Sequence, residues 1–113
     1  MAKKNLLLEA PPYAVENTLK ELGNNLRTAR LRRNLTIANI AARIGTGPRA
    51  VTDAEKGNPS TSAAVYMALL WALDLIDQME YVADPAQDLE GQRLSIIKQR
   101  SRTKDSGELD NDF

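Results

Sequence analysis

The sequence contains no cysteine and no histidine among its 113 residues. Without thiols it forms neither disulfides nor thiolate metal sites, and without imidazoles it lacks the commonest general acid and base of enzymes. No glycine-rich phosphate loop follows a predicted strand. Asp74 and Asp77 lie three residues apart, which could indicate a metal site. Carboxylates with this spacing on an otherwise apolar helix are more often its solvent-exposed edge. We therefore expect no enzyme activity, no cofactor, no metal and no small-molecule substrate.

Long apolar runs are also missing. No stretch approaches the roughly 20 apolar residues that span a bilayer, and the three leucines at 6–8 are too few for a signal peptide and precede Glu9. The sequence therefore predicts a soluble, cytoplasmic protein that contacts no membrane. Its length favours one domain with tails.

The formal net charge is zero, but the charges are segregated along the chain. Residues 20–56 carry eight cations and three carboxylates, a net charge of +5, whereas residues 57–92 carry six carboxylates and no cation. This division is typical of a protein with two different partners, one of them polyanionic. Solvated faces of an ordinary domain account for the same division.

Apolar spacing predicts an all-α protein. Apolar residues recur every three or four positions and would form one face of a long first helix that ends near Arg33. They are Val15, Leu19, Leu22, Leu26 and Ala29. Gly23 lies within that helix at a cost of about 1 kcal/mol relative to alanine. Later helices are expected from Thr36 to Ile44, from Pro48 to about Lys56, from Ser60 or Thr61 to Leu73, over Leu75–Val82, and weakly from Asp88 through Leu94 and Ile97.

The tetrapeptide Gly45-Thr46-Gly47-Pro48 separates the second and third predicted helices. The two glycines can supply backbone angles that other residues resist, and proline is pre-shaped for the first position of a helix. Two short helices joined by such a turn are typical of a helix-turn-helix unit, whose second helix enters the major groove of DNA. A small helical bundle that merely shares this spacing is the alternative.

The segment LGNNLRTARLRRNLTIANIAARIGTGPRAVTDAEKG, which begins at Leu22, resembles the first three helices of the Cro/C1-type (XRE) helix-turn-helix family. The resemblance extends to about Leu73 and implies a five- to six-helix lambda-repressor-like domain. We expect a flexible N-terminal arm over 1–13, a DNA-binding and dimerisation domain over 14–83, and a weak helix with a disordered charged tail over 84–113.

The resemblance assigns base reading to the start of the third helix. The residues concerned are Gly47, Pro48 and Arg49, with Thr52 and Asp53 one turn later. Arg49 is the strongest reader because its guanidinium can bond guanine O6 and N7 together. Pro48 can only contact thymine methyl groups or position its neighbours. Asp53 either accepts from a cytosine amino group or pairs with Arg49, and we expect the pairing.

Phosphate contacts are expected where amides and cations cluster beside the reading helix. They are assigned to Thr36, Ile37, Arg43, Thr46, Lys56 and Asn58. Family members often carry glutamine at the position of Ile37, so only the backbone amide of Ile37 remains to contact a phosphate. The alternative for Arg43 is an ordinary surface cation.

Arg30 and Glu55 match positions that pair between the first and third helices of the family. That ion pair would fix the angle of the reading helix; the alternative is two unrelated surface charges.

A wider match, at the front and at the back of the motif, points to a particular group within the family. Two segments look like HipB-type antitoxins, which accompany HipA-like serine/threonine kinase toxins: PPYAVENTLKELGNNLRTARLRR at the front and LLWALDLIDQMEYVADPAQDLEG at the back. The resemblance implies a homodimer that binds double-stranded operator DNA, represses its own operon and holds the kinase. A free-standing repressor without a toxin is the alternative.

A two-fold dimer needs a self-complementary interface, and the apolar residues at the end of the fourth helix and beyond it supply one. We assign it to Trp71, Leu75, Ile76 and Met79, while Val65, Leu69 and Leu73 are expected in the core. The alternative is that all of these residues fill the core of one subunit.

Overall fold

A computed structural model describes residues 5–106, in which all regular structure is helical and no strand occurs. The all-α prediction is therefore confirmed. The chain forms two units, Met1–Asp77 and Gln78–Phe113, each of which is described by itself; the sequence placed this boundary after residue 83. None of the helices described is long and apolar enough to cross a membrane.

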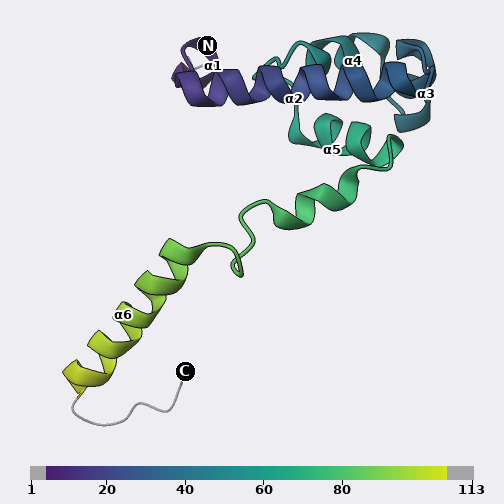
Figure 1. The fold of residues 1–113 in the computed structure, drawn as a ribbon. Helices are drawn as coiled ribbons and strands as arrows, with labels where there is room; N and C mark the ends of the chain where they lie inside the picture. The colour runs from purple at the N-terminus through teal and green to yellow at the C-terminus, as the bar shows by residue number, and fades with distance from the viewer. Residues whose placement is uncertain (1–4, 107–113) are drawn as a thin grey trace. The chain divides into compact units, whose positions relative to one another are not determined.

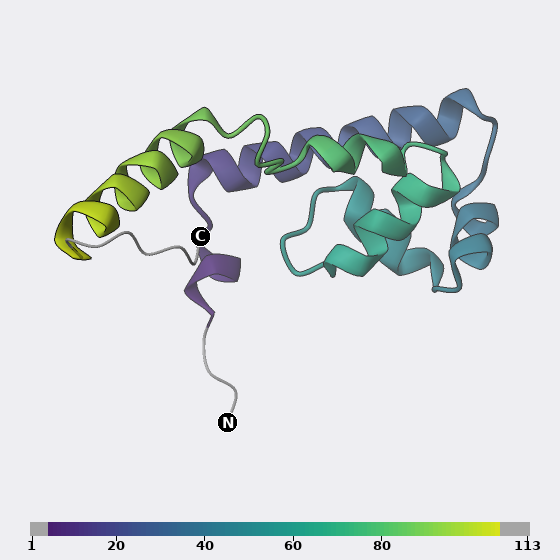
Figure 2. The ribbon, with the colours of Figure 1, turned by 90° about the horizontal axis from the view of Figure 1, so that it is seen from below.

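The first unit is a cluster of short helices beside one long helix (Figures 1 and 2). Helix α4 contacts α2, α3 and α5, and α3 also contacts α5. Helices α3 to α5 gather along the C-terminal part of α2, so the N-terminal part of α2 extends past them. The helices of this unit are α1 (Leu6–Glu9), α2 (Tyr13–Arg32), α3 (Ile37–Ile44), α4 (Pro48–Glu55) and α5 (Ala63–Ala72).

The core lies where these helices meet. Every helix from α2 to α5 contributes to it, and its least exposed large side chains include Leu26, Ile40, Val51, Leu69 and Leu73, each at most 2% exposed. Full burial of such a side chain contributes about 1.5 to 3 kcal/mol relative to leaving it in water. These contacts hold α4 against α2 and hold α3 against α4 and α5, which fixes the surface that the two short helices present.

Helix α2 begins directly after Pro12, which cannot continue an earlier helix, and it ends before Asn34, whose φ of +56° turns the chain. The apolar face that predicted α2 is only partly buried. Leu26 and Ala29 are in the core, but Val15 is 40% exposed. The reason is that no helix of the cluster covers the first turns of α2 (Figure 1).

Gly23 and Gly57 allow the backbones of α2 and the end of α4 to touch. A Cβ atom at Gly23 would lie 2.6 Å from the carbonyl oxygens of Ala54 and Glu55 and 2.7 Å from the Gly57 nitrogen. A Cβ atom at Gly57, where φ is +71°, would lie 2.5 Å from the Leu19 carbonyl oxygen. Gly23 is therefore required by close packing, which the sequence pattern did not reveal.

Helix α5 begins later than predicted. The Asn58 side chain accepts bonds from the Ser60 amide and hydroxyl at 2.9 and 2.7 Å, which keeps Ser60 in a turn. Ser62 caps the helix instead, accepting from the Val65 amide at 3.3 Å. All sides of α5 are apolar, and most of them are covered, but Trp71 remains 53% exposed.

The ends of the chain are more helical than the sequence indicated. The predicted flexible arm contains α1, whose first turn is capped by the Asn5 side chain at 3.1 Å from the Leu7 amide. Residues 1–4 of that arm lie outside the described residues. The predicted fifth helix is a 3-10 helix, η1 (Ile76–Tyr81).

Helix α6 (Leu89–Ser106) corrects the predicted disorder of residues 98–106; the remainder of that tail, 107–113, lies outside the described residues. The Asp88 side chain accepts from the Gly91 amide at 2.9 Å, and Glu90 pairs with Arg93. No proline or glycine occurs from Gln92 to Ser106, and leucine, glutamine, arginine and lysine are good helix formers. Helix propensity therefore decided this segment, although it lacks a continuous apolar face.

Candidate nucleic-acid interface

Helix α3 is started and stopped by local contacts. The Thr36 hydroxyl accepts from the Asn39 amide at 3.0 Å while the Thr36 amide donates to the Asn39 side chain at 3.2 Å, a reciprocal capping box. Gly45 ends the helix with φ of +79°, and the Thr46 amide donates to the Ala41 carbonyl at 3.0 Å. The contacts of Gly45 and Thr46 form the predicted sharp turn between α3 and α4.

Gly47 is not needed for the backbone of this turn. Its φ of −78° and ψ of 158° are extended angles that any residue adopts, so the predicted special angle is present at Gly45 but not at Gly47. A Cβ atom at Gly47 would also meet nothing within 4 Å. Gly47 caps α4 without a side chain, which leaves the backbone there open to a close approach by a ligand.

The five predicted base-reading residues lie at the N-cap of α4 and along the helix, with Thr52 and Asp53 one turn after Pro48 and Arg49. Gly47, Pro48 and Arg49 are exposed, and Thr52 and Asp53 are half-buried. Val51 and Ala54 on the same helix are completely buried and anchor it in the core.

The predicted ion pair between Arg49 and Asp53 is absent from the salt bridges of residues 5–106. Thr52 donates its hydroxyl hydrogen to the Pro48 carbonyl at 3.2 Å. Arg49, Thr52, Asp53 and Lys56 together line one open hollow. The guanidinium of Arg49 therefore keeps its donors for a ligand.

The residues predicted to contact phosphate differ in which hydrogen-bond donors and charges remain free of contacts within the protein. Lys56 is exposed, and Ile37 is half-buried in the first turn of α3, where a backbone amide has no partner one turn earlier. The Thr46 amide is used in the turn, which leaves its hydroxyl. Thr36 is exposed, but its hydroxyl and its amide both serve the cap. Asn58 accepts from Ser60 through its side-chain oxygen.

Arg43 and Trp71, predicted to serve DNA and the dimer respectively, lie together. The Arg43 guanidinium carbon is 5.7 Å from the centre of the Trp71 ring, within the range of a cation–π contact. Both side chains are exposed. Arg43 therefore has a partner on α5, and the two residues form a single surface feature.

The predicted ion pair between Arg30 and Glu55 is present and buried. Arg30 Nε lies 2.6 Å from Glu55 Oε2 and Nη2 lies 3.0 Å from Oε1, with both side chains less than 10% exposed. Arg30 Nη1 also donates to the Leu35 carbonyl at 2.9 Å. The hydrogen bonds to Glu55 raise the pKa of Arg30 above its usual value. The guanidinium thus joins α2, the α2–α3 loop and the end of α4.

Sequence reasoning missed Tyr66, which supports the loop after α4. Its hydroxyl donates to the Asn58 carbonyl at 3.0 Å, and burial raises the pKa of the phenol above its ordinary value. The only available signal was a tyrosine in an apolar helix, where a buried hydroxyl needs a polar partner.

The predicted interface residues are not in the core. Trp71 is exposed and Leu75, Ile76 and Met79 are half-buried, whereas Leu69 and Leu73 are buried as expected. Val65, also expected in the core, is half-buried. Trp71, Leu75 and Ile76 belong to the first unit and Met79 to the second.

Comparison of the chain with protein-family models, with curated proteins and with solved structures gave no significant match.

Proposed function

We propose that the protein binds double-stranded DNA in a sequence-specific manner, with the start of α4 as its reading element. The observation that carries this proposal is the state of Arg49. Its side chain is exposed and unpaired among the described residues, on a helix whose opposite face is completely buried. A cation held in this way is available to a ligand without rearrangement of the fold.

The residues beside Arg49 suit a DNA groove. Arg49 can bond guanine O6 and N7 at once, and Pro48 can contact a thymine methyl group. Because Asp53 has no ion pair with Arg49, its carboxylate can accept from a cytosine amino group, which offsets repulsion by the phosphates. The absent side chain of Gly47 allows the backbone to approach closely.

We assign phosphate binding to residues beside α4. Lys56 supplies an exposed charge at the end of α4, and the Ile37 amide supplies a donor at the positive end of the α3 dipole. The Thr46 hydroxyl lies in the turn between the two helices. Thr36, Arg43 and Asn58 are weaker candidates, since Thr36 and Asn58 serve the cap and the loop and Arg43 contacts Trp71.

Replacing Arg49 with alanine tests the proposal. We expect a loss of about 1 to 3 kcal/mol on a duplex that the protein has selected from a random pool, and a smaller loss on a scrambled duplex, because base discrimination disappears while phosphate contacts remain. Fluorescence anisotropy at one fixed salt concentration measures both affinities.

Arg49→Lys is the matched control, because it keeps the charge and removes the planar fork of donors. We expect it to retain binding to the scrambled duplex and to lose most of the discrimination. Equal weakening on both duplexes by Arg49→Ala, with full recovery by Arg49→Lys, would make Arg49 a phosphate contact and remove it from base reading.

The proposed DNA-binding form is a homodimer. A single reading helix offers few base contacts, and helix-turn-helix proteins usually bind two half-sites about one turn of DNA apart. Trp71, Leu75, Ile76 and Met79 are apolar residues that remain at least partly accessible in one chain. Association of two copies would remove these side chains from water.

Ile76→Asp tests the interface, because a carboxylate buried between two subunits without a partner is costly. We expect the dimer dissociation constant to rise at least about tenfold, which corresponds to about 1.4 kcal/mol. Light scattering over a range of concentrations measures it. Leu31→Asp changes an apolar residue that is 46% exposed on α2 and should leave the dimer intact. A dimer that survives Ile76→Asp places the interface elsewhere.

The antitoxin role is proposed on the resemblance of the front segment (residues 11–33) and the back segment (residues 69–91) to HipB-type antitoxins. It predicts that the protein holds a HipA-like kinase through a surface outside α4 and represses the operon that encodes both. A free-standing repressor would bind DNA and no kinase. Co-purification from the native host separates the two, and Arg49→Ala should leave the kinase bound, since α4 must stay free to contact DNA.

A further inference from the structure

Helix α6 reverses the charge of the segment before it. Three carboxylates and no cation occur between residues 78 and 88, whereas α6 contains five cations and two carboxylates, Glu90 and Asp105, with no carboxylate between Gly91 and Lys104. All five cations are exposed, and only Arg93 forms a salt bridge within the part of the chain whose side chains are described, with Glu90. The five cations are Arg93, Lys98, Arg100, Arg102 and Lys104.

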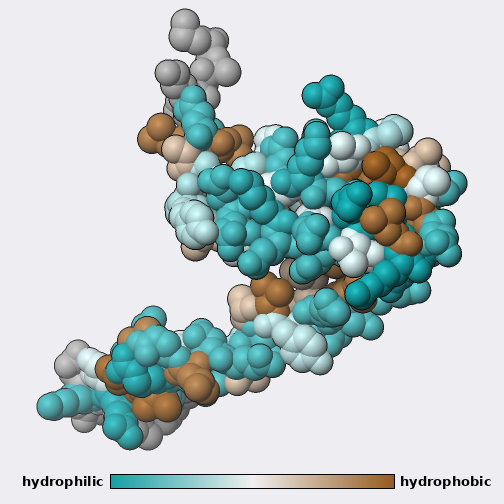
Figure 3. Space-filling model, turned by 45° about the horizontal axis from the view of Figure 1, so that its top comes forward, coloured by the Kyte–Doolittle hydropathy of each residue, from teal (hydrophilic) through white to brown (hydrophobic). Residues whose placement is uncertain are grey.

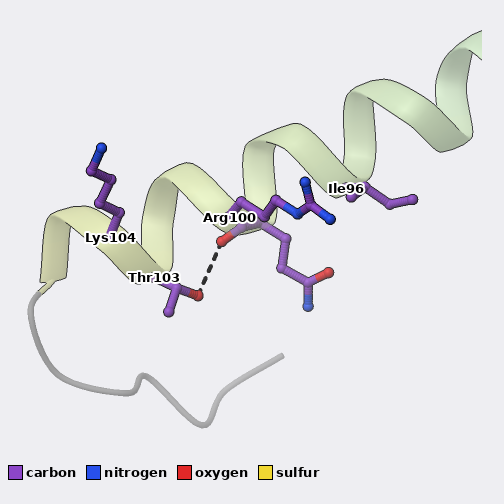
Figure 4. A pocket seen from close by; sticks show the side chains of 5 residues that line it. Ile96, Arg100, Thr103 and Lys104 are labelled. Atoms are coloured by element: carbon purple, nitrogen blue, oxygen red, sulfur yellow. Dashed lines mark hydrogen bonds between the residues drawn. The ribbon is translucent and has the colours of Figure 1, made fainter.

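The cations of α6 occupy two sides of the helix. At about 100° per residue, Lys98 and Arg102 share one side, while Arg93, Arg100 and Lys104 share another, roughly opposite. The second side is seen in Figure 4, where Arg100 and Lys104 project from α6 in a hollow that Ile96, Gln99 and Thr103 also line. This hollow belongs to a single helix and contains no acidic side chain.

The apolar residues of α6 form no continuous stripe. Leu94, Ile96 and Ile97 are each about half exposed, and no apolar residue occurs from Lys98 to Lys104. A partner helix or a membrane surface requires an apolar face repeated every three to four residues along the helix. In Figure 3 the apolar surface of the second unit is accordingly interrupted by hydrophilic side chains.

We infer that α6 is a second DNA-binding element, which contacts the phosphates of the duplex on both walls of a groove. A helix with its side chains is about 10 to 12 Å wide and the major groove is about 12 Å wide. Cations on two opposite sides of a helix can therefore reach both phosphate strands. Gln92, Ser95, Gln99 and Ser101 add donors between the charges. The inference rests on the proposed function, to which it adds a contact that carries no sequence information.

Charge repulsion within α6 gives this inference a second readout. Lys98 and Arg102, and Arg100 and Lys104, are like charges four residues apart, which destabilise a helix. Phosphates placed beside them would remove this repulsion. The helical circular dichroism of the full-length protein should therefore increase when a duplex is added.

The test changes four cations of the full-length protein, as K98Q, R100Q, R102Q and K104Q together. We expect affinity for the selected duplex and for the scrambled duplex to fall by about the same factor. The slope of log affinity against log salt should become shallower by about 3 to 4 units, since each phosphate contact contributes about 0.9. The duplex-induced gain in helix should shrink as well. The charge-preserving variant K98R, R100K, R102K and K104R should retain the original slope.

The outcomes separate this inference from the proposed function. If the wild-type protein selects no duplex, the proposed function is wrong and the inference falls with it. If it selects a duplex and the neutral variant keeps the original salt slope, α6 does not contact phosphates while the proposed function stands. A neutral variant that keeps this slope but loses a co-purifying kinase would assign α6 to an acidic protein surface instead.

Discussion

Glu55→Ala is expected to lower the free energy of unfolding by about 3 to 5 kcal/mol, because it leaves the buried Arg30 guanidinium without its carboxylate. Both side chains are less than 10% exposed, so water cannot replace the two lost hydrogen bonds. Urea unfolding followed by circular dichroism measures the change. Glu16→Ala breaks an exposed ion pair with Lys20 and is the matched control, with an expected loss of at most about 1 kcal/mol.

The double variant Arg30→Met with Glu55→Leu separates the orphaned charge from the pair itself. Replacing a buried ion pair by apolar residues of similar volume is often neutral or stabilising, so we expect this variant to recover most of the lost stability. If it also loses discrimination between the selected and scrambled duplexes, the ion pair serves to orient α4. A single Glu55→Ala variant as stable as Glu16→Ala would contradict the burial of the pair.

Gly23→Ala is expected to destabilise the protein by about 3 kcal/mol, at the upper end of the usual cost of overpacking. At an ordinary position inside a helix the same change would add about 1 kcal/mol of stability. Here the new methyl group would lie 2.6 to 2.7 Å from backbone atoms of Ala54, Glu55 and Gly57, which cannot rotate away as a side chain can. The end of α4 would have to move from α2.

Gly47→Ala is the control for this prediction, because a Cβ atom there meets nothing within 4 Å and φ is negative. We expect it to change stability by less than about 0.5 kcal/mol. Thermal or urea unfolding compares the two variants directly. A stable Gly23→Ala protein would mean that α2 and α4 separate at little cost.

Helices α3 and α4 and the turn between them could be predicted from sequence because their determinants are local. The capping box that starts α3 joins Thr36 to Asn39, three positions later, and the positive φ of Gly45 lies directly after the helix that it ends. Pro48 occupies the first turn of α4, where its missing amide hydrogen costs nothing. Local contacts of this kind depend little on the rest of the fold. They therefore predicted the helices on which the proposed reading residues lie.

The sequence by itself determined the helical class, the end of α2, the starts and ends of α3 and α4, and the helix on which Arg49 lies, since all of these follow from residues within a few positions of one another along the chain. Only the tertiary structure decided that Gly23 is a point of backbone contact, that Arg43 lies over Trp71, and that Arg49 does not pair with Asp53. The first two depend on which helix packs beside which, a property of residues far apart in sequence. The third depends on the direction that one side chain takes on a helix already fixed by its other face, and helical spacing alone does not set that direction.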